Sequence, residues 1–147
     1  MKRLNLFLVA ILFVAIGSFG ATDYGLTVGG VDVTSENCSN ITGEHIEKYS
    51  SATDDEYYIK YDPATKTLTF KNILIERTGS YNRAILNEDV DGLKIVFLGK
   101  NELSAEDSSP VRLNNNTTIT VPEGGELRVY GGDEDGITVG NGKTLIF

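Results

Sequence analysis

A repeat of about 26 residues is the feature that most constrains how this chain can fold. Two sets of alternating pairs recur, apolar at every position except Asn87, the first at intervals of 26 residues and the second at 25, 26 and 26. A polar turn lies between the sets each time, with Asp89, Asn115 and Asn141 at the same interval. A regular interval of this length is typical of stacked repeats. The first set is Ile59/Tyr61, Ile85/Asn87, Val111/Leu113 and Ile137/Val139, and the second is Leu68/Phe70, Leu93/Ile95, Ile119/Val121 and Leu145/Phe147.

The residues within each repeat predict short strands rather than helices. Apolar and polar side chains alternate, many are β-branched, and Gly, Asn or Asp interrupts them every few positions. Two all-β architectures fit this pattern. One is a right-handed parallel β-helix, a solenoid with about 26 residues per coil, and the other is an antiparallel sandwich of hairpins, for which residues 140–142 are a turn signal. We favour the β-helix, because a sandwich has no physical reason to keep a fixed interval.

The first 20 residues have the pattern of a secretory signal peptide. Lys2 and Arg3 precede an unbroken apolar run over residues 6–16, and the small residues Ser18 and Gly20 suit cleavage after Gly20. The apolar run is too short to cross a bilayer as a helix. We therefore predict a secreted or cell-surface protein, without membrane insertion once the signal is removed; an uncleaved N-terminal anchor is the alternative.

The segment before the repeats has a different pattern. Residues 24–41 alternate on both sides of Gly29-Gly30, which predicts a β-hairpin. We assign residues 21–56 to this hairpin and a connecting loop, which cap the first coil, and residues 57–147 to the coils. The last repeat stops on an apolar strand at Phe147, so we expect the chain to be truncated at its C-terminus. The alternative is that this strand pairs with another chain, which predicts self-association.

Charge argues against one class of partner. Without Lys2 and Arg3, 11 basic residues face 21 acidic ones, a net charge of −10. The Lys and Arg residues do not cluster along the sequence, so we expect no binding to nucleic acid. Cys38 is the single cysteine, which precludes an internal disulfide, and we interpret it as a small buried apolar residue.

Acidic turns are the candidates for chemistry. No motif of nucleophilic catalysis accompanies the single His45, and we predict no catalytic residues, although paired carboxylates are all that a sugar-cleaving enzyme requires. Calcium prefers oxygen ligands such as those of the turns at residues 87–92 and 131–136. We predict calcium binding there, with solvated turns as the alternative. The predicted ligands are Asp89, Asp91, Asp133 and Asp135.

Three tyrosines are candidates for contacts with sugars. The flat face of a phenol ring can stack on the apolar face of a pyranose while its hydroxyl group forms hydrogen bonds. A parallel sheet repeats such groups at about 4.8 Å, which suits a linear polymer. We predict carbohydrate contacts for Tyr58, Tyr81 and Tyr130, with packing inside the protein as the alternative role.

Two stretches carry a resemblance to a known family. Val33-Thr34-Ser35-Glu36-Asn37 and residues 61–72, which read YDPATKTLTFKN, are similar to the opening of secreted bacterial carbohydrate-binding right-handed parallel β-helix domains of the Bacteroidales and Clostridia type. Phe70 stands where that family usually has Leu. The resemblance covers residues 24–147. It implies a secreted or cell-surface location, calcium, and binding of acidic polysaccharides such as pectin, and it transfers no catalytic or ligand-binding residue to this chain.

These observations lead to three functional expectations. The first is a non-enzymatic secreted or cell-surface module that binds a polysaccharide in a calcium-dependent manner. The second is a structural or adhesive surface spacer, and the third is a β-helix polysaccharide lyase.

Overall fold

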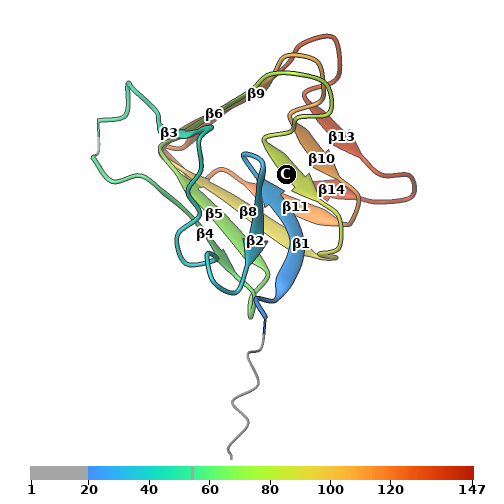
Figure 1. Cartoon of the computed structure of the whole chain (residues 1–147). Helices are drawn as coiled ribbons and strands as arrows, with labels where there is room; N and C mark the ends of the chain where they lie inside the picture. The colour runs from blue at the N-terminus through green and yellow to red at the C-terminus, as the bar shows by residue number, and fades with distance from the viewer. Residues whose placement is uncertain (1–19, 54) are drawn as a thin grey trace, which may run out of the picture.

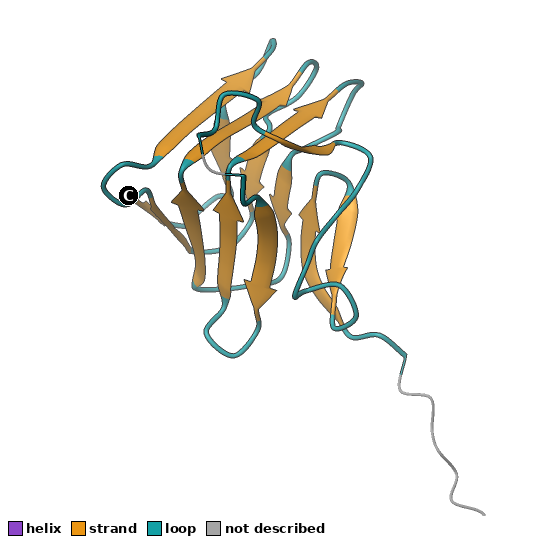
Figure 2. Ribbon diagram, turned by 90° about the vertical axis from the view of Figure 1, so that its left-hand side faces the viewer, coloured by secondary structure: helices purple, strands orange, loops and turns teal. Residues whose placement is uncertain are grey.

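The fold is a β-solenoid of about three turns (Figure 1). In this computed structural model, residues 20–53 and 55–147 are described, and they contain strands, turns and loops but no helix (Figure 2). The predicted signal peptide falls on residues 1–20 and so lies, apart from Gly20, outside the described residues. The prediction of stacked parallel coils with about 26 residues each is confirmed.

Each coil contributes one strand to each of three sheets, which form the walls of the solenoid. Sheet A has the order β13-β10-β7-β1-β2, sheet B the order β12-β9-β6-β3, and sheet C the order β14-β11-β8-β5-β4. The coil strands of sheet A are Ile85–Asn87 (β7), Val111–Leu113 (β10) and Ile137–Val139 (β13). Those of sheet B are Ile73–Arg77 (β6), Lys100–Ala105 (β9) and Glu126–Gly131 (β12). Those of sheet C are Thr67–Lys71 (β5), Leu93–Leu98 (β8), Thr117–Thr120 (β11) and Leu145–Ile146 (β14).

The interval between neighbouring coils is constant in sheet A and varies in sheet C. Ile85, Val111 and Ile137 lie side by side at the expected 26-residue interval. In sheet C, however, Ile95 lies beside Leu68 and Ile119, rather than beside Phe70 and Val121 as the second set of pairs predicts. That part of the predicted register is wrong by two residues. A shift of two leaves the same side chains facing inward, so the apolar alternation is satisfied by either register.

The N-terminal cap adds antiparallel strands to all three sheets. Asp23–Val28 (β1) and Val31–Thr34 (β2) form the predicted hairpin, and β1 pairs antiparallel with β7 of the first coil. Gly29 and Gly30 both have positive φ, +58° and +83°, as a tight two-residue hairpin turn requires.

The rest of the cap corrects two expectations. Ile46–Lys48 (β3), within the predicted connecting loop, pairs antiparallel with β6. Tyr58–Asp62 (β4), expected to stack under Ile85 as part of the first coil, instead pairs antiparallel with β5. A strand pointing inward at alternate residues has the same pattern in a hairpin as in a coil, so periodicity does not separate the two.

The core lies between the three sheets and consists of the inward residues of the coils and the cap. The rings of Phe70 and Phe97 stack with centroids 4.9 Å apart, a pairing worth about 0.5–1.5 kcal/mol beyond the burial of their area. The largest fully buried side chains are Phe70, Phe97, Leu26, Ile41, Ile59, Leu68, Ile73, Ile75, Ile85, Leu93, Ile95 and Leu103.

Buried asparagines hold neighbouring coils in register at one corner. Asn72, which has φ +53°, accepts a hydrogen bond from the backbone N of Lys100 (3.1 Å). Asn101 in turn accepts one from the backbone N of Ile73 (3.1 Å). Because an unpaired buried amide is costly, these bonds oppose any slip of one coil against the next.

Candidate functional site

The structure places the three predicted tyrosines on three separate parts of the surface. Tyr58 lies on β4 at the edge of sheet C, with the Nζ of Lys60 5.0 Å from its ring centroid. Tyr81 lies in the loop between β6 and β7 and is 84% exposed, whereas Tyr130 lies on β12 and is 51% exposed. The three rings therefore do not form a single stacking platform, and each has its own surroundings.

Tyr130 lines an open hollow of about 400 Å³ on the outside of sheet B. In the sheet register Tyr130 lies beside Ser104, and Ser104 beside Glu76, so three outward side chains form a row across three coils. Glu106 and the backbone of Gly131 and Gly132 complete this side of the hollow. An aromatic face next to a hydroxyl and two carboxylates provides the apolar contact and the hydrogen-bond acceptors that a sugar ring uses.

Tyr81 lines a second hollow, of about 250 Å³, at the corner between sheet A and sheet B. Its other lining residues include two arginines, Arg77 at the end of β6 and Arg83 just before β7. Arg77 lines both hollows. Neither arginine was singled out by sequence reasoning, because their hollow forms only where the cap turn meets β6 and the following loop, and the cap turn is far from both in the chain.

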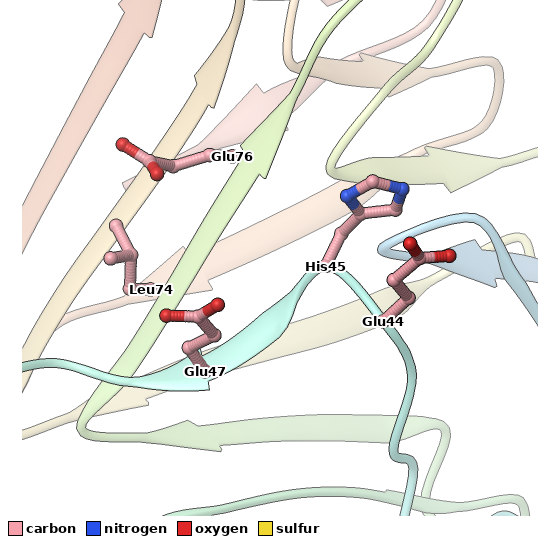
Figure 3. A pocket seen from close by; sticks show the side chains of 5 residues that line it. All are labelled: Glu44, His45, Glu47, Leu74 and Glu76. Carbon is pink, nitrogen blue, oxygen red and sulfur yellow. The ribbon is translucent and has the colours of Figure 1, made fainter.

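A smaller hollow of about 90 Å³ lies on the sheet B side of the cap (Figure 3). Glu44, His45 and Glu47 approach it from β3 and the residues before β3, while Leu74 and Glu76 come from β6. This small hollow adjoins the hollow of Tyr130, because Glu76 lines both. The outer face of sheet B is thus predominantly acidic at the capped end.

The predicted calcium ligands lie in two different turns and are all exposed. Asp89 and Asp91 belong to the turn between β7 and β8, whereas Asp133 and Asp135 belong to the turn between β12 and β13. Asp91 accepts hydrogen bonds from the backbone N and the Nδ2 of Asn116 in the next coil, at 3.3 and 2.8 Å. Within residues 20–53 and 55–147, no three His, Cys, Asp or Glu side chains gather as a metal site would require. Calcium binding stays a prediction.

A fourth hollow, open and of about 360 Å³, lies on the outside of sheet C beside the turn that joins β4 to β5. Asp62 fixes this turn by accepting hydrogen bonds from the Oγ1 of Thr65 (2.7 Å) and the backbone N of Ala64 (3.0 Å), and these bonds lower the pKa of its carboxyl group. Tyr61 also lines this hollow. Burial raises the pKa of its hydroxyl group, and the neighbouring Tyr24 raises this pKa further. Five of the seven residues that line this hollow carry hydroxyl groups, namely Ser39, Tyr61, Thr65, Thr67 and Thr69.

Cys38 packs against the core, as expected for a small apolar residue, but it is half-buried rather than fully buried. In the described part of the chain, no helix is long and apolar enough to cross a membrane.

Comparisons with protein-family models, with curated proteins and with solved structures find no match to this chain. The resemblance to carbohydrate-binding β-helix domains therefore stays a prediction, and the function has to be argued from the surface of the solenoid itself.

Proposed function

We propose that this protein is a secreted or cell-surface module that binds a polysaccharide on the outside of sheet B without cleaving it. The observation that carries the proposal is the half-exposed Tyr130 ring in a hollow of about 400 Å³, at one end of the Glu76, Ser104 and Tyr130 row. The row follows the solenoid axis, so successive sugar units would meet successive coils.

The carboxylates of Glu76 and Glu106 make binding depend on the charge of the polysaccharide. They accept hydrogen bonds from the hydroxyls of a neutral chain directly. An acidic chain brings further negative charge to the same hollow, and a divalent cation between the two sets of carboxylates removes that repulsion. Arg77 lines the same hollow and offsets part of this negative charge, so we expect calcium to strengthen the binding of acidic polysaccharides, whereas chelation leaves the binding of a neutral one unchanged.

Affinity electrophoresis in gels that contain soluble neutral or acidic polysaccharides tests the proposal, with calcium and with chelator. A retarded protein whose retardation is lost in Tyr130→Ala and largely kept in Tyr130→Phe is the expected result. Loss of ring stacking weakens binding by roughly 3- to 10-fold. Tyr57→Ala is the matched control, since Tyr57 is also 51% exposed but lines none of the hollows described above. Unaltered mobility in every polysaccharide, or equal loss in both variants, contradicts the proposal.

Self-association as a surface spacer is the second candidate function, and the last coil favours it. Ile146 and Phe147 are 56% and 80% exposed, and β12, β13 and β14 each form the outer edge of their sheet. Exposed edges and apolar side chains together promote strand pairing between chains. Light scattering during gel filtration at several concentrations tests this candidate, which requires a mass that rises with concentration.

The third candidate, a polysaccharide lyase, is separated from the first by its product. Each cleavage by a lyase leaves a double bond that absorbs ultraviolet light, so incubation with polygalacturonate gives rising absorbance. We expect constant absorbance, because the proposed module binds without reaction.

A further inference from the structure

The corner hollow that contains Tyr81 concentrates positive charge in a strongly acidic protein. The chain has a formal net charge of −8, yet Arg77 and Arg83 both line this one hollow of about 250 Å³. Thr27 of β1 and Leu86 of β7 line it from sheet A, and Gly30 lines it from the turn of the cap. A local excess of positive charge against the sign of the whole molecule identifies a site that favours an anion.

Arg77 is held in place by neutral groups. Its Nη1 donates to the backbone O of Gly29 and its Nη2 donates to the Oδ1 of Asn82, both at 3.1 Å. A Cβ atom at Gly30 would lie only 2.7 Å from Nη2, so the guanidinium lies directly against the cap turn, where only glycine leaves room. Among the side-chain atoms of the described residues, its Nε is buried without a hydrogen-bond partner. The group is thus fixed in position and incompletely satisfied.

Arg83 is held in the same manner from the other side of the hollow. Its Nη1 donates to the backbone O of Ser109 at 2.9 Å. The loop before it is tied to the next coil, because the Oγ of Ser108 donates to the backbone O of Asn82 at 2.7 Å. Of the five N–H groups on this guanidinium, only one is used in that contact, which leaves donors for a ligand.

Within the described residues, neither arginine forms an ion pair, although Glu76 and Glu106 line the adjoining Tyr130 hollow together with Arg77. Over residues 20–53 and 55–147, the ion pairs involve Lys48, Lys71 and Arg128, and none involves Arg77 or Arg83. Asp32 of β2, which lies opposite Thr27 in the sheet, accepts a hydrogen bond from the Oγ1 of Thr27 at 3.0 Å. Two rigid guanidinium groups with neutral partners provide the planar, charge-assisted donors that bind a carboxylate.

The other residues that line the hollow indicate the shape of the uncharged part of the ligand. Tyr81 has a φ of +66°, an uncommon backbone angle for a residue with a side chain, and its ring is 84% exposed at the rim. Leu86 is half-buried on the same side. An aromatic ring and an apolar side chain next to two cations suit a compact ring that carries one carboxylate.

We propose that the hollow between Arg77 and Arg83 binds a small ring-sized organic carboxylate, with the carboxylate on the two guanidinium groups and the ring against Tyr81. This site shares Arg77 with the Tyr130 hollow but does not rest on polysaccharide binding, since its ligand is a monomeric acid. An aromatic acid and a sugar acid share the required chemistry, and they are distinguished below.

Titrations of the protein with benzoate, glucuronate and inorganic phosphate, followed by amide and arginine Nε–H resonances in NMR spectra, test the site. We expect benzoate or glucuronate to shift the amide resonances of Gly29, Gly30 and Asn82 in a saturable manner. A shift with benzoate alone identifies an aromatic acid as the ligand class, and a shift with glucuronate alone identifies a sugar acid. Tighter binding of phosphate than of both carboxylates overturns the proposal, as does the absence of saturable shifts with either acid.

Variants separate this site from general attraction of anions. Arg83→Gln should weaken carboxylate binding by about 10-fold or more, the effect of losing a charge-assisted bond, and Arg83→Lys should recover only part of it. Arg128→Gln removes the same charge from sheet B, where Arg128 pairs with Glu126, and should leave the affinity unchanged. Tyr81→Ala tests the ring contact without altering charge. Equal weakening by Arg83→Gln and Arg128→Gln contradicts a specific site.

Discussion

The two ends of the solenoid are built from the same type of strand and differ in how well they are covered. At the first coil, the cap places antiparallel strands β1, β3 and β4 beside β7, β6 and β5. Inward residues there, such as Val28, Ile59 and Ile75, have no exposed surface. At the last coil, the inward residues Val129, Ile137 and Leu145 are only half-buried.

This contrast shows that burial in a solenoid is supplied by the neighbouring layer rather than by the coil itself. Ile85 and Ile137 occupy equivalent positions of the repeat, and Ile85, which is covered on both sides, is fully buried while Ile137 is not. Nearest-neighbour coupling of this kind makes stability depend on position along the axis.

Removal of one large side chain from each end should therefore have unequal effects. We expect Ile59→Ala at the capped end to lower the free energy of unfolding by about 2–5 kcal/mol, because it leaves a cavity in a fully buried site. Ile137→Ala should cost less than about 2 kcal/mol, because part of that side chain already contacts solvent. Urea unfolding followed by circular dichroism measures both. Equal losses would show that the two ends are equally covered in solution.

Two glycine substitutions, one at each end, should also have unequal effects on stability. Gly29 of the cap turn has φ +58°, and a Cβ atom there would lie 2.6 Å from the Cγ1 of Ile46, so Gly29→Ala combines backbone strain with a clash. Gly142 of the last turn has φ +71° and no atom within 4 Å of the added Cβ, so Gly142→Ala carries the strain alone, about 1–2 kcal/mol. Gly29→Ala should lower the melting temperature further than Gly142→Ala. The reverse order would mean that Ile46 moves aside without cost.

The smallest expected effect is a pH dependence of stability that arises from Tyr61 at the capped end. Burial of Tyr61, followed by the influence of Tyr24, whose ring centroid is 5.2 Å away, raises the pKa of the Tyr61 hydroxyl above its ordinary value near 10. The neutral hydroxyl is favoured in the folded state. Its contribution to stability is therefore fully present below the unfolded pKa and is lost as the pH rises through the folded pKa. Tyr61→Phe should show a smaller loss of stability than the unaltered protein between neutral and strongly alkaline pH, measured by urea unfolding.

The coils were predictable from the sequence, and their exact pairing was predictable only in part. Turn residues and β-branched side chains at a steady interval lead directly to β7, β10 and β13, whose 26-residue register is as expected. The displaced register of β8 was not accessible, because alternation reports only which face a residue occupies. For the same reason, the antiparallel pairing of β4 looked like one more coil.

The candidate sites were less predictable than the fold. Tyr81 and Tyr130 could be selected as exposed aromatic residues, and each does line a hollow. Arg77 gave no such signal, since it continues the alternate set of Ile73 and Ile75 in β6, where an inward side chain is expected. The cap turn, which is 47 residues earlier in the chain at Gly30, brings this arginine into the corner hollow, and Arg77 lines the Tyr130 hollow as well.

The pairing of β1 with β7 also has a consequence for the order of folding. Val28 meets Ile85 across 57 residues of chain, whereas β4 and β5 are joined by a short turn and need no other strand to pair. During synthesis the cap hairpin therefore emerges long before β7 is made, and until then the edge of β1 that pairs with β7 stays unpaired. Contacts between such distant segments are slow to form, so we expect closure of the cap to limit the folding rate, after the β4 and β5 hairpin has formed.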